Sequence, residues 1–147
     1  MINPLDHPGL FVPNGYQKTS DETWDYNCIA WAAADKENWW WPDGYTAMGK
    51  LAYWPKKAPK KVTLKAFTLA FKTLKYEKCQ NGDLEKGYEK IAIFALNNIP
   101  THAARQLPNG NWTHKMGPGV DLESSLSAVE GRVYGIAVRY MRRKLRR

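Results

Sequence analysis

The stretch YEKIAIFALNNIPTHAARQLPNGNWTHKMG, residues 88–117, decides the fold. Its first nine residues are rich in β-branched and aromatic side chains, which favour a strand. Residues 97–100 (NNIP) then indicate a turn. Asn109 and Gly110 separate two further short segments, and Asn-Gly between such segments is a strong hairpin signal. We therefore expect antiparallel strands joined by tight turns over this stretch.

Two helices are expected before it. The first begins near Asp25 or Asn27, either of which can act as the N-cap, and continues through CIAWAAAD, residues 28–35. It ends before the segment WWWPDG, where Pro42 breaks it. The second helix begins after Thr63, which can cap it. Its apolar side chains recur at helical spacing, with lysines on the other face: Leu64, Phe67, Phe71 and Leu74.

The remaining segments complete a single domain of residues 1–147. We expect an irregular arm (residues 1–22), a long loop (44–61) and a strand (74–79). After the hairpin we expect one or two helical turns capped by Asp121 (121–129), a last strand (132–141) and a basic tail (142–147). Helices followed by several antiparallel strands predict an α+β fold, in which the N-terminal helices pack on an antiparallel sheet.

Composition narrows the class of protein. A chain of 147 residues suggests one domain, and no apolar run approaches the roughly 20 residues that a membrane span requires. The start, MINPLDHPGL, has neither the basic nor the apolar region of a signal peptide. Two cysteines, Cys28 and Cys79, do not make a disulfide framework. We therefore expect a cytoplasmic protein with reduced thiols and no membrane contact, with export by a route without a cleaved signal left open.

The net charge of +8 comes from two short segments. The tail RRKLRR, residues 142–147, carries five basic residues and the segment KKAPKK, residues 56–61, carries four, whereas the rest of the chain has 13 basic and 14 acidic residues. A nucleic-acid-binding domain typically spreads its positive charge along one face. The tail is therefore interpreted as a solvated terminus, with binding to RNA, DNA or an acidic partner as the alternative.

Cys28 has the sequence context of a nucleophile. A helix N-terminus stabilises a thiolate through unpaired N–H groups and the helix dipole, and Cys28 lies in the first turn of the first expected helix. A nucleophilic thiol also needs a base. His7 lies in the irregular arm, but His102 and His114 lie twelve residues apart, on the two strands of the expected hairpin. Because their positions have the same parity, both side chains can point to the same face.

A cysteine at a helix start, followed by a strand that opens with histidine and a next strand with a polar residue twelve positions on, resembles the NlpC-like and papain-like cysteine hydrolases. The hairpin THAARQLPNGNWTHK, residues 101–115, is similar to the strands that carry the histidine and the third residue of that family. The resemblance implies a papain-like or NlpC-like core and no cofactor. It also implies that Cys28 is the nucleophile, that His102 is the base and that His114 orients the base.

The sequence is also similar, over residues 24–140, to a bacterial domain family with the pattern YNCIAWA…WWWP…YWP…THAARQ. In that pattern the position of His114 is often serine, which orients an imidazole poorly. Gln106, Lys115 and Asp121 are therefore alternative candidates for the orienting or electrostatic partner.

Each candidate residue also has a structural interpretation. Cys28 can be a buried core thiol, because cysteine is among the residue types most often buried. Tyr26, Asn27 and the backbone N–H of Cys28 can form an oxyanion hole, but Asn27 can equally serve as the helix cap alone. Trp40 and Trp41 either pack in the core or form a substrate-binding wall beside Cys28. No C-x-x-C or His-x₃-His spacing is present, so no metal site is predicted.

The leading functional prediction is a cysteine-dependent hydrolase or acyltransferase that acts on an amide bond of a protein or peptide, as a peptidase, an amidase or a deamidase. One version is a bacterial effector or toxin that modifies a target protein. The alternative is a catalytically inactive papain-like module that contacts a protein or nucleic acid through tryptophan-rich and lysine-rich surfaces. The sequence leaves the bond acted on and the oligomeric state open.

Overall fold

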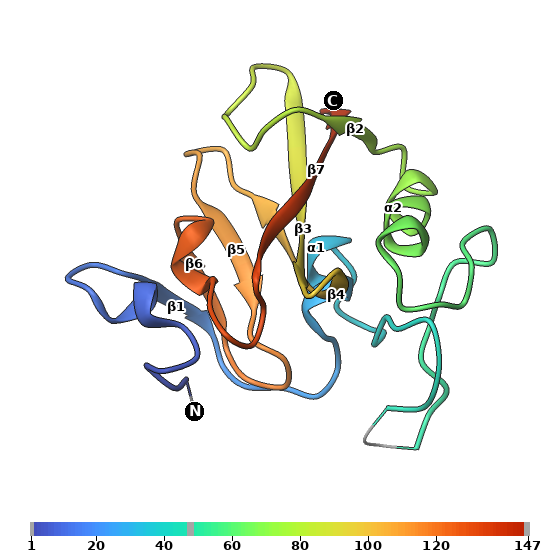
Figure 1. The fold of residues 1–147 in the computed structure, drawn as a ribbon, viewed down its shortest axis with the longest axis horizontal. Coiled ribbons are helices and arrows are strands. Elements are labelled where there is room, and N and C mark those ends of the chain that lie inside the picture. Colours follow the sequence, from blue (N-terminus) through green and yellow to red (C-terminus); the bar gives the residue numbers. More distant parts are fainter. Residues whose placement is uncertain (1, 47–48, 146–147) are drawn as a thin grey trace.

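The computed structural model of the protein describes residues 2–46 and 49–145. Within these residues, a seven-stranded antiparallel sheet has the order β1-β6-β5-β4-β3-β7-β2 (Figure 1). The strands are β1 Gln17–Ser20, β2 Glu77–Cys79, β3 Tyr88–Leu96, β4 Ile99–Gln106, β5 Trp112–Lys115, β6 Asp121–Ser124 and β7 Ile136–Lys144. The helices are α1 Cys28–Ala32 and α2 Leu64–Lys72, and two 3₁₀ segments are η1 Pro8–Phe11 and η2 Ser127–Val129. The fold thus combines helices with an antiparallel sheet, as predicted, and is mostly sheet.

The two faces of the sheet carry separate hydrophobic clusters. Both helices pack on one face, in a helix-side cluster that includes Ile29, Phe67, Phe71, Ile93 and Ala103. The 3₁₀ segments η1 and η2 cover the other face, in an arm-side cluster that includes Leu10, Phe94, Ala104, Leu122 and Val129. Successive residues of β4 therefore point to different clusters, as the alternation of a strand requires.

Helix α2 forms where the apolar spacing predicts it. The Thr63 hydroxyl oxygen accepts a hydrogen bond from Ala66 N at 3.1 Å and so caps the helix. Among the described residues, no helix has the length and apolar character to cross a membrane. The loop predicted over residues 44–61 contains only isolated bridges in its described part. Residues 47 and 48 of that loop lie outside the described residues.

Both predicted hairpins are confirmed. Strand β3 covers the nine residues whose composition favours a strand. Asn97 and Asn98 then have φ angles of 51° and 68°, which a two-residue hairpin turn of type I′ requires at both positions. In the next turn, Leu107 N donates a hydrogen bond to Asn111 O at 2.7 Å.

The first helix is shorter than the predicted helix over residues 28–35. It ends at Ala32, because Ala34 has a left-handed conformation with φ of 62°. Asp35, which follows, accepts a hydrogen bond from the Trp40 indole Nε1 at 2.8 Å. These contacts outweigh the helix propensity of the alanines.

Two predictions near the sheet edge are wrong. Residues 121–129 form strand β6 and then η2 rather than helical turns, so Asp121 does not act as a helix cap. The arm over residues 1–22 is not irregular throughout, because it contains η1 and β1. Strand β1 pairs with β6, and β6 pairs with β5. Pairing between segments so distant along the chain leaves no local sequence pattern, which is why it was not predicted.

The basic tail is not wholly a solvated terminus. Arg142 and Arg143 belong to β7 and form ion pairs with Glu85 and Glu89, respectively. Arg143 also lies over the ring of Tyr76, at 4.4 Å from its centroid. The interpretation of the tail is therefore wrong for these residues. The last two arginines of the tail lie outside the described residues.

Candidate active site

Cys28 is the first residue of α1, and Asn27 fixes that start. The Asn27 Oδ1 atom accepts hydrogen bonds from Ala30 N at 3.1 Å and from Trp40 N at 3.0 Å. Its Nδ2 atom donates to Trp40 O at 2.7 Å. Asn27 thus caps the helix and ties it to the tryptophan segment. Its amide is therefore engaged with Ala30 and Trp40, and no hydrogen bond joins it to the thiol among the described residues.

The sulfur of Cys28 occupies a gap in the sheet. Strands β4 and β5 pair only at Arg105–Thr113 and Gln106–Trp112. The N–H of Leu107 donates to Asn111 O on the β5 side of the hairpin. Alternate residues of a strand direct their backbone N–H and C=O groups to the same side. The backbone groups of Thr101 and Ala103 therefore also point toward β5. Because β5 does not pair with β4 at these residues, Cys28 Sγ lies beside their backbone groups instead.

The main chain around His102 adjoins the sulfur. Cys28 Sγ lies 4.0 Å from Thr101 O, and the backbone N–H of Ala103 acts to lower the pKa of the thiol.

The thiol is held in its protonated form. Cys28 has only 6% of its surface exposed, and this burial raises the pKa of its thiol to about 11. The N–H groups of Ala103, Ile29 and Cys28 itself and the charge of Lys115 act in the opposite direction, as expected at a helix N-terminus. Donors that would stabilise a thiolate are thus present, but desolvation outweighs them in this state.

His102 and His114 meet as the hairpin predicts. His102 Nε2 lies 3.1 Å from His114 Nδ1, a hydrogen bond, and the two rings are stacked with their planes 15° apart. Burial lowers the pKa of His114 to about 3 and that of His102 well below its ordinary value. Both imidazoles are therefore neutral at physiological pH. His102 Nδ1 is buried and has no hydrogen-bond partner among the described residues.

The ring of His102 lies on the arm side of the sheet. It packs edge-on against Phe94 and flat against Tyr134, whose ring centroid is 4.0 Å away. The other neighbour of Tyr134 is the ring of His7, at 4.8 Å. Two of the three histidines, His7 and His102, thus pack on Tyr134, and the third, His114, contacts His102. Cys28 belongs to the helix-side cluster, and no hydrogen bond joins its thiol to the imidazole of His102 in the described structure.

Tyr26 and Asp121 form a separate polar cluster on the helix side. The Asp121 Oδ2 atom accepts hydrogen bonds from Tyr26 Oη at 2.6 Å and from Ser20 Oγ at 2.5 Å. The hydroxyl of Tyr26 is therefore engaged with this carboxylate. The cluster ties the segment before α1 to the edge of the sheet.

Lys115 belongs to the same cluster. Its buried ammonium donates to the carbonyl oxygens of Thr23, at 3.0 Å, and Gly119, and it lies 5.3 Å from the centroid of the Tyr26 ring. Burial lowers the pKa of this ammonium, and the nearby Asp121 and Cys28 oppose that effect. Lys115 makes no hydrogen bond to His102, so its influence on the site is electrostatic and directed at the thiol.

The remaining candidates lie away from the thiol or are engaged elsewhere. Trp40 is buried in the helix-side cluster, and Trp41 packs edge-on against Phe67 at 5.4 Å. Gln106 lies at the opposite end of β4 from His102 and donates from Nε2 to Gly82 O at 2.7 Å. The structure thus shows packing roles for the two tryptophans, the interpretation that the sequence left open.

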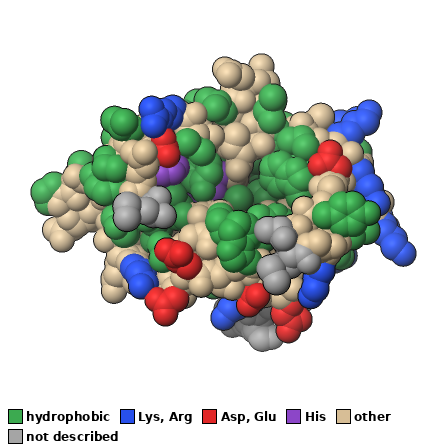
Figure 2. Space-filling view, turned by 90° about the horizontal axis from the view of Figure 1, so that it is seen from below, with side chains coloured by type: hydrophobic (Ala, Val, Ile, Leu, Met, Phe, Trp, Pro, Cys, Tyr) green, Lys and Arg blue, Asp and Glu red, His purple; other side chains and the backbone are tan. Residues whose placement is uncertain are grey.

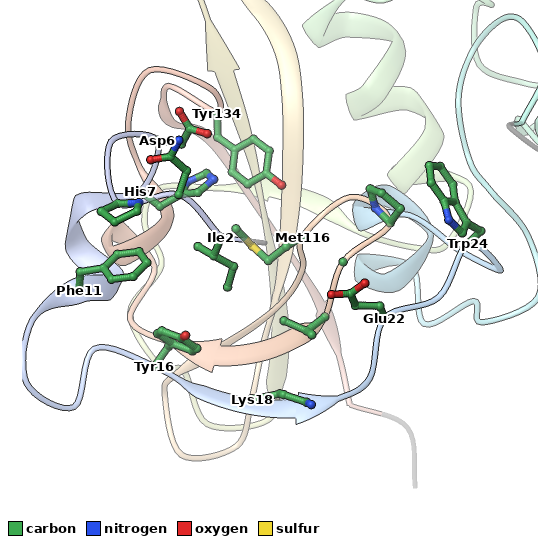
Figure 3. A pocket seen from close by; sticks show the side chains of 15 residues that line it. Ile2, Asp6, His7, Phe11, Tyr16, Lys18, Glu22, Trp24, Met116 and Tyr134 are labelled. Carbon is green, nitrogen blue, oxygen red and sulfur yellow. The ribbon is translucent and has the colours of Figure 1, made fainter.

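A cleft of about 820 Å³ adjoins the histidine cluster. Its walls come from the N-terminal arm, the segment around Trp24, the β5–β6 turn and Tyr134 (Figure 3). Tyr134 points into the cleft toward Met116, and its ring also stacks on His102. The same aromatic ring therefore contacts the candidate base and lines the cleft. Figure 2 shows histidine side chains set among hydrophobic ones beside a hollow in the surface.

Sequence reasoning did not select Tyr134 or His7. Tyr134 falls in GRVYG, residues 131–135, which the sequence assigned largely to a strand. The sequence feature that could have indicated a fixed loop at Tyr134 is the pair of glycines on either side, Gly131 and Gly135. Both have positive φ, and a Cβ atom on either would collide with a backbone oxygen, that of Asp6 or of Ala95, respectively. A loop pinned so tightly presents its tyrosine in one position.

Among the described residues, no group of three or more histidine, cysteine or carboxylate side chains is arranged to hold a metal ion.

Comparison with known proteins gives one match. No curated protein and no solved structure matches the chain significantly. A family model matches residues 17–142, a range that contains Cys28, His102 and His114 but not the cleft-lining residues of the arm from Ile2 to Tyr16. The chain therefore belongs to the family described as Domain of unknown function (DUF7689).

Proposed function

We propose that the protein is a cysteine-dependent hydrolase or acyltransferase of papain-like or NlpC-like type that acts on an amide bond. Cys28 is the nucleophile, His102 is the base and His114 orients the base. One observation carries the proposal: His102 Nε2 is engaged by His114 at 3.1 Å, while its buried Nδ1 has no partner. A neutral imidazole nitrogen without a protein partner can accept a proton from a donor such as a thiol.

The position of that free nitrogen supports a thiol as its partner. Nδ1 is the ring nitrogen nearer to the main chain, and the sulfur of Cys28 lies 4.0 Å from the backbone oxygen of Thr101, the residue before His102. The two groups do not meet in this conformation, because the ring of His102 packs against Phe94 and Tyr134, whereas Cys28 belongs to the helix-side cluster. Catalysis therefore requires a rearrangement that brings the sulfur to Nδ1. The neutral imidazole can then accept the thiol proton, because burial keeps it uncharged.

The chemistry follows from these roles. His102 Nδ1 takes the proton of Cys28, and the sulfur attacks the carbonyl carbon of the substrate. The backbone N–H groups at the start of α1 stabilise the oxyanion. The amide C–N bond breaks, the leaving nitrogen takes the proton from His102, and a thioester remains on Cys28. Water or a second amine then attacks the thioester and gives a proton to His102. The C–S bond breaks, and the departing sulfur takes that proton, which restores Cys28 and His102.

The cleft is the proposed route for the substrate. Its lining is mainly apolar, with Ile2, Phe11, Met116 and Val120 among its residues, which suits a protein or peptide segment with apolar side chains. Tyr134 must move for a substrate to reach His102, because its ring stacks on His102 and also lines the cleft. Both cysteines are unpaired, and a reducing compartment such as the cytoplasm is the proposed location.

The second candidate is an inactive binding module of the same fold. The observation that favours it is the burial of the thiol, with only 6% of Cys28 exposed and the pKa raised to about 11. In that case the tryptophan-rich and lysine-rich surfaces would bind a protein or nucleic acid, and Cys28 would only pack.

Acylation by p-nitrophenyl acetate distinguishes the two. A nucleophilic Cys28 should displace p-nitrophenol and carry one acetyl group, which intact-mass spectrometry and peptide mapping detect. Cys28→Ser should abolish this adduct, and Cys79→Ser, the matched control, should leave it unchanged. His102→Gln should slow both formation and hydrolysis of the adduct. Acetylation of Cys79 alone, or of neither thiol, would favour the binding module.

A further inference from the structure

A second cavity lies at the opposite end of β4 from His102. Its volume is about 740 Å³. It opens between the end of α1, the segment before β3 and the turn that follows β4. Its lining is largely apolar, and the apolar side chains are Ala34, Leu84, Tyr88, Leu107, Pro108 and Leu145. None of its residues lines the cleft beside Tyr134.

Arg105 is one of five charged residues that line this cavity in the described structure, and the others are Glu85, Lys86, Glu89 and Arg143. The guanidinium of Arg105 lies over the ring of Trp31, 5.0 Å from the centroid, and its Nε donates to Trp31 O at 3.4 Å. Among the described residues, its two Nη atoms have no hydrogen-bond or ion-pair partner. Burial lowers the pKa of this guanidinium. The indole thus fixes one face of the guanidinium, and its outer nitrogens remain available.

The carboxylates near the cavity form no ion pair with Arg105 among the described residues, although the charge of Glu89 opposes the effect of burial on the pKa of its guanidinium. Glu89 pairs with Arg143, at 2.5 Å from Nη2, and Glu85 pairs with Arg142. Each of these arginines therefore has its own acidic partner within the protein. Arg105 is a half-buried cation without one, although a desolvated charge is costly unless it is paired. A ligand with a negative charge would supply the missing counter-ion.

We propose that this cavity binds a carboxylate attached to an apolar body. The carboxylate pairs with the Nη atoms of Arg105, whose planar group matches the two oxygens. The apolar body lies against Leu84, Tyr88 and Leu145. Two sources share this chemistry, a free aliphatic acid and the C-terminus of an apolar peptide. The site does not depend on Cys28, so it stands or falls separately from the catalytic proposal.

Fluorescence titration of the full chain tests the site with two pairs of probes. The first pair is 11-(dansylamino)undecanoic acid and its methyl ester, and the second is dansyl-Leu-Phe with a free or an amidated C-terminus. The acid of at least one pair should bind about tenfold more tightly than its neutral analogue, and the preferred pair identifies the source. Equal binding of acid and neutral analogue in both pairs would overturn the proposal, and this comparison needs no variant.

Variants then test whether the charge of Arg105 is responsible for the preference for the acid over its neutral analogue. Arg105→Gln should remove the preference for the acid, whereas Arg105→Lys should retain part of it because a point charge remains. The matched control is Arg132→Gln, which removes an exposed arginine that pairs with Asp6 away from the cavity. An acid preference that persists in folded Arg105→Gln, or that disappears in the control, would contradict the assignment.

Discussion

Tyr134 lies flat on His102, with ring centroids 4.0 Å apart and planes 9° apart. The backbone oxygen of Tyr134 also accepts a hydrogen bond from Thr101 Oγ1 at 2.6 Å, next to His102 in the chain. His7 of the N-terminal arm packs on Tyr134 and bonds Val129 O through Nδ1 at 2.7 Å. The arm and the tyrosine therefore cover the imidazole together.

Replacing this cover should expose the proposed catalytic pair, Cys28 and His102. In Tyr134→Ala, water reaches His102, so the desolvation that disfavours charge on the imidazole and the thiol decreases. We expect alkylation of Cys28 by iodoacetamide at pH 7 to become several-fold faster. The measurement is the alkylation rate in a Cys79→Ser background, where Cys28 is the only thiol.

Tyr45→Ala is the control for that comparison, because Tyr45 is 74% exposed and does not line the cleft. Its alkylation rate should equal that of the parent. Circular dichroism should first establish that both variants are folded. An unchanged rate in folded Tyr134→Ala would show that the ring does not control access to Cys28.

Acid should destabilise the fold through the buried histidines. The pKa of His114 is about 3 in the folded state and about 6.5 when unfolded, so below pH 6.5 the unfolded state binds more protons. Its contribution to stability is fully present above pH 6.5 and is lost as the pH falls toward 3. The loss is up to about 1.4 kcal/mol per pH unit for each such histidine. Urea unfolding between pH 7 and pH 4 measures it.

Carboxylates also titrate in acid, so the comparison needs a variant without one histidine. In His114→Gln, the fall in unfolding free energy between pH 6.5 and pH 4 should be smaller than in the parent chain, by roughly 1 to 3 kcal/mol. Identical pH profiles for the two chains would mean that His114 is not buried in its neutral form.

Asn27 should matter more for stability than an ordinary cap. Asn27→Ala removes the helix cap and also leaves the N–H and C=O of Trp40 without their partners. We expect a loss of roughly 2 to 4 kcal/mol in unfolding free energy. Thr63→Ala, which removes only a cap, should cost about 1 kcal/mol. Equal losses in urea unfolding would contradict the double role of Asn27.

The sequence predicted the parts of the fold that local patterns specify. The apolar spacing of α2, the composition of β3 and the Asn-Gly turn each depend on neighbouring residues, and each is present in the structure. The contact between His102 and His114 followed from strand parity and a tight turn.

Features that depend on distant contacts were not predictable in the same way. Residues 121–124 are a strand because they pair with β1 and β5, although their composition suits a helix start. The covering of His102 by Tyr134 joins residues from two separate segments, and only the two tight glycines of GRVYG indicated a fixed loop. The burial of Cys28 likewise comes from the gap between β4 and β5 rather than from its neighbours in the chain.

The most direct test of the proposed Cys28–His102 pair is the pseudo-first-order rate of Cys28 alkylation at pH 7 in two chains. Both carry Cys79→Ser, and one also carries His102→Gln, which keeps a polar side chain of similar size but removes the base. The account predicts that the rate falls at least about tenfold in His102→Gln. An equal or faster rate in the folded variant would contradict it, because the thiol would then react without the imidazole.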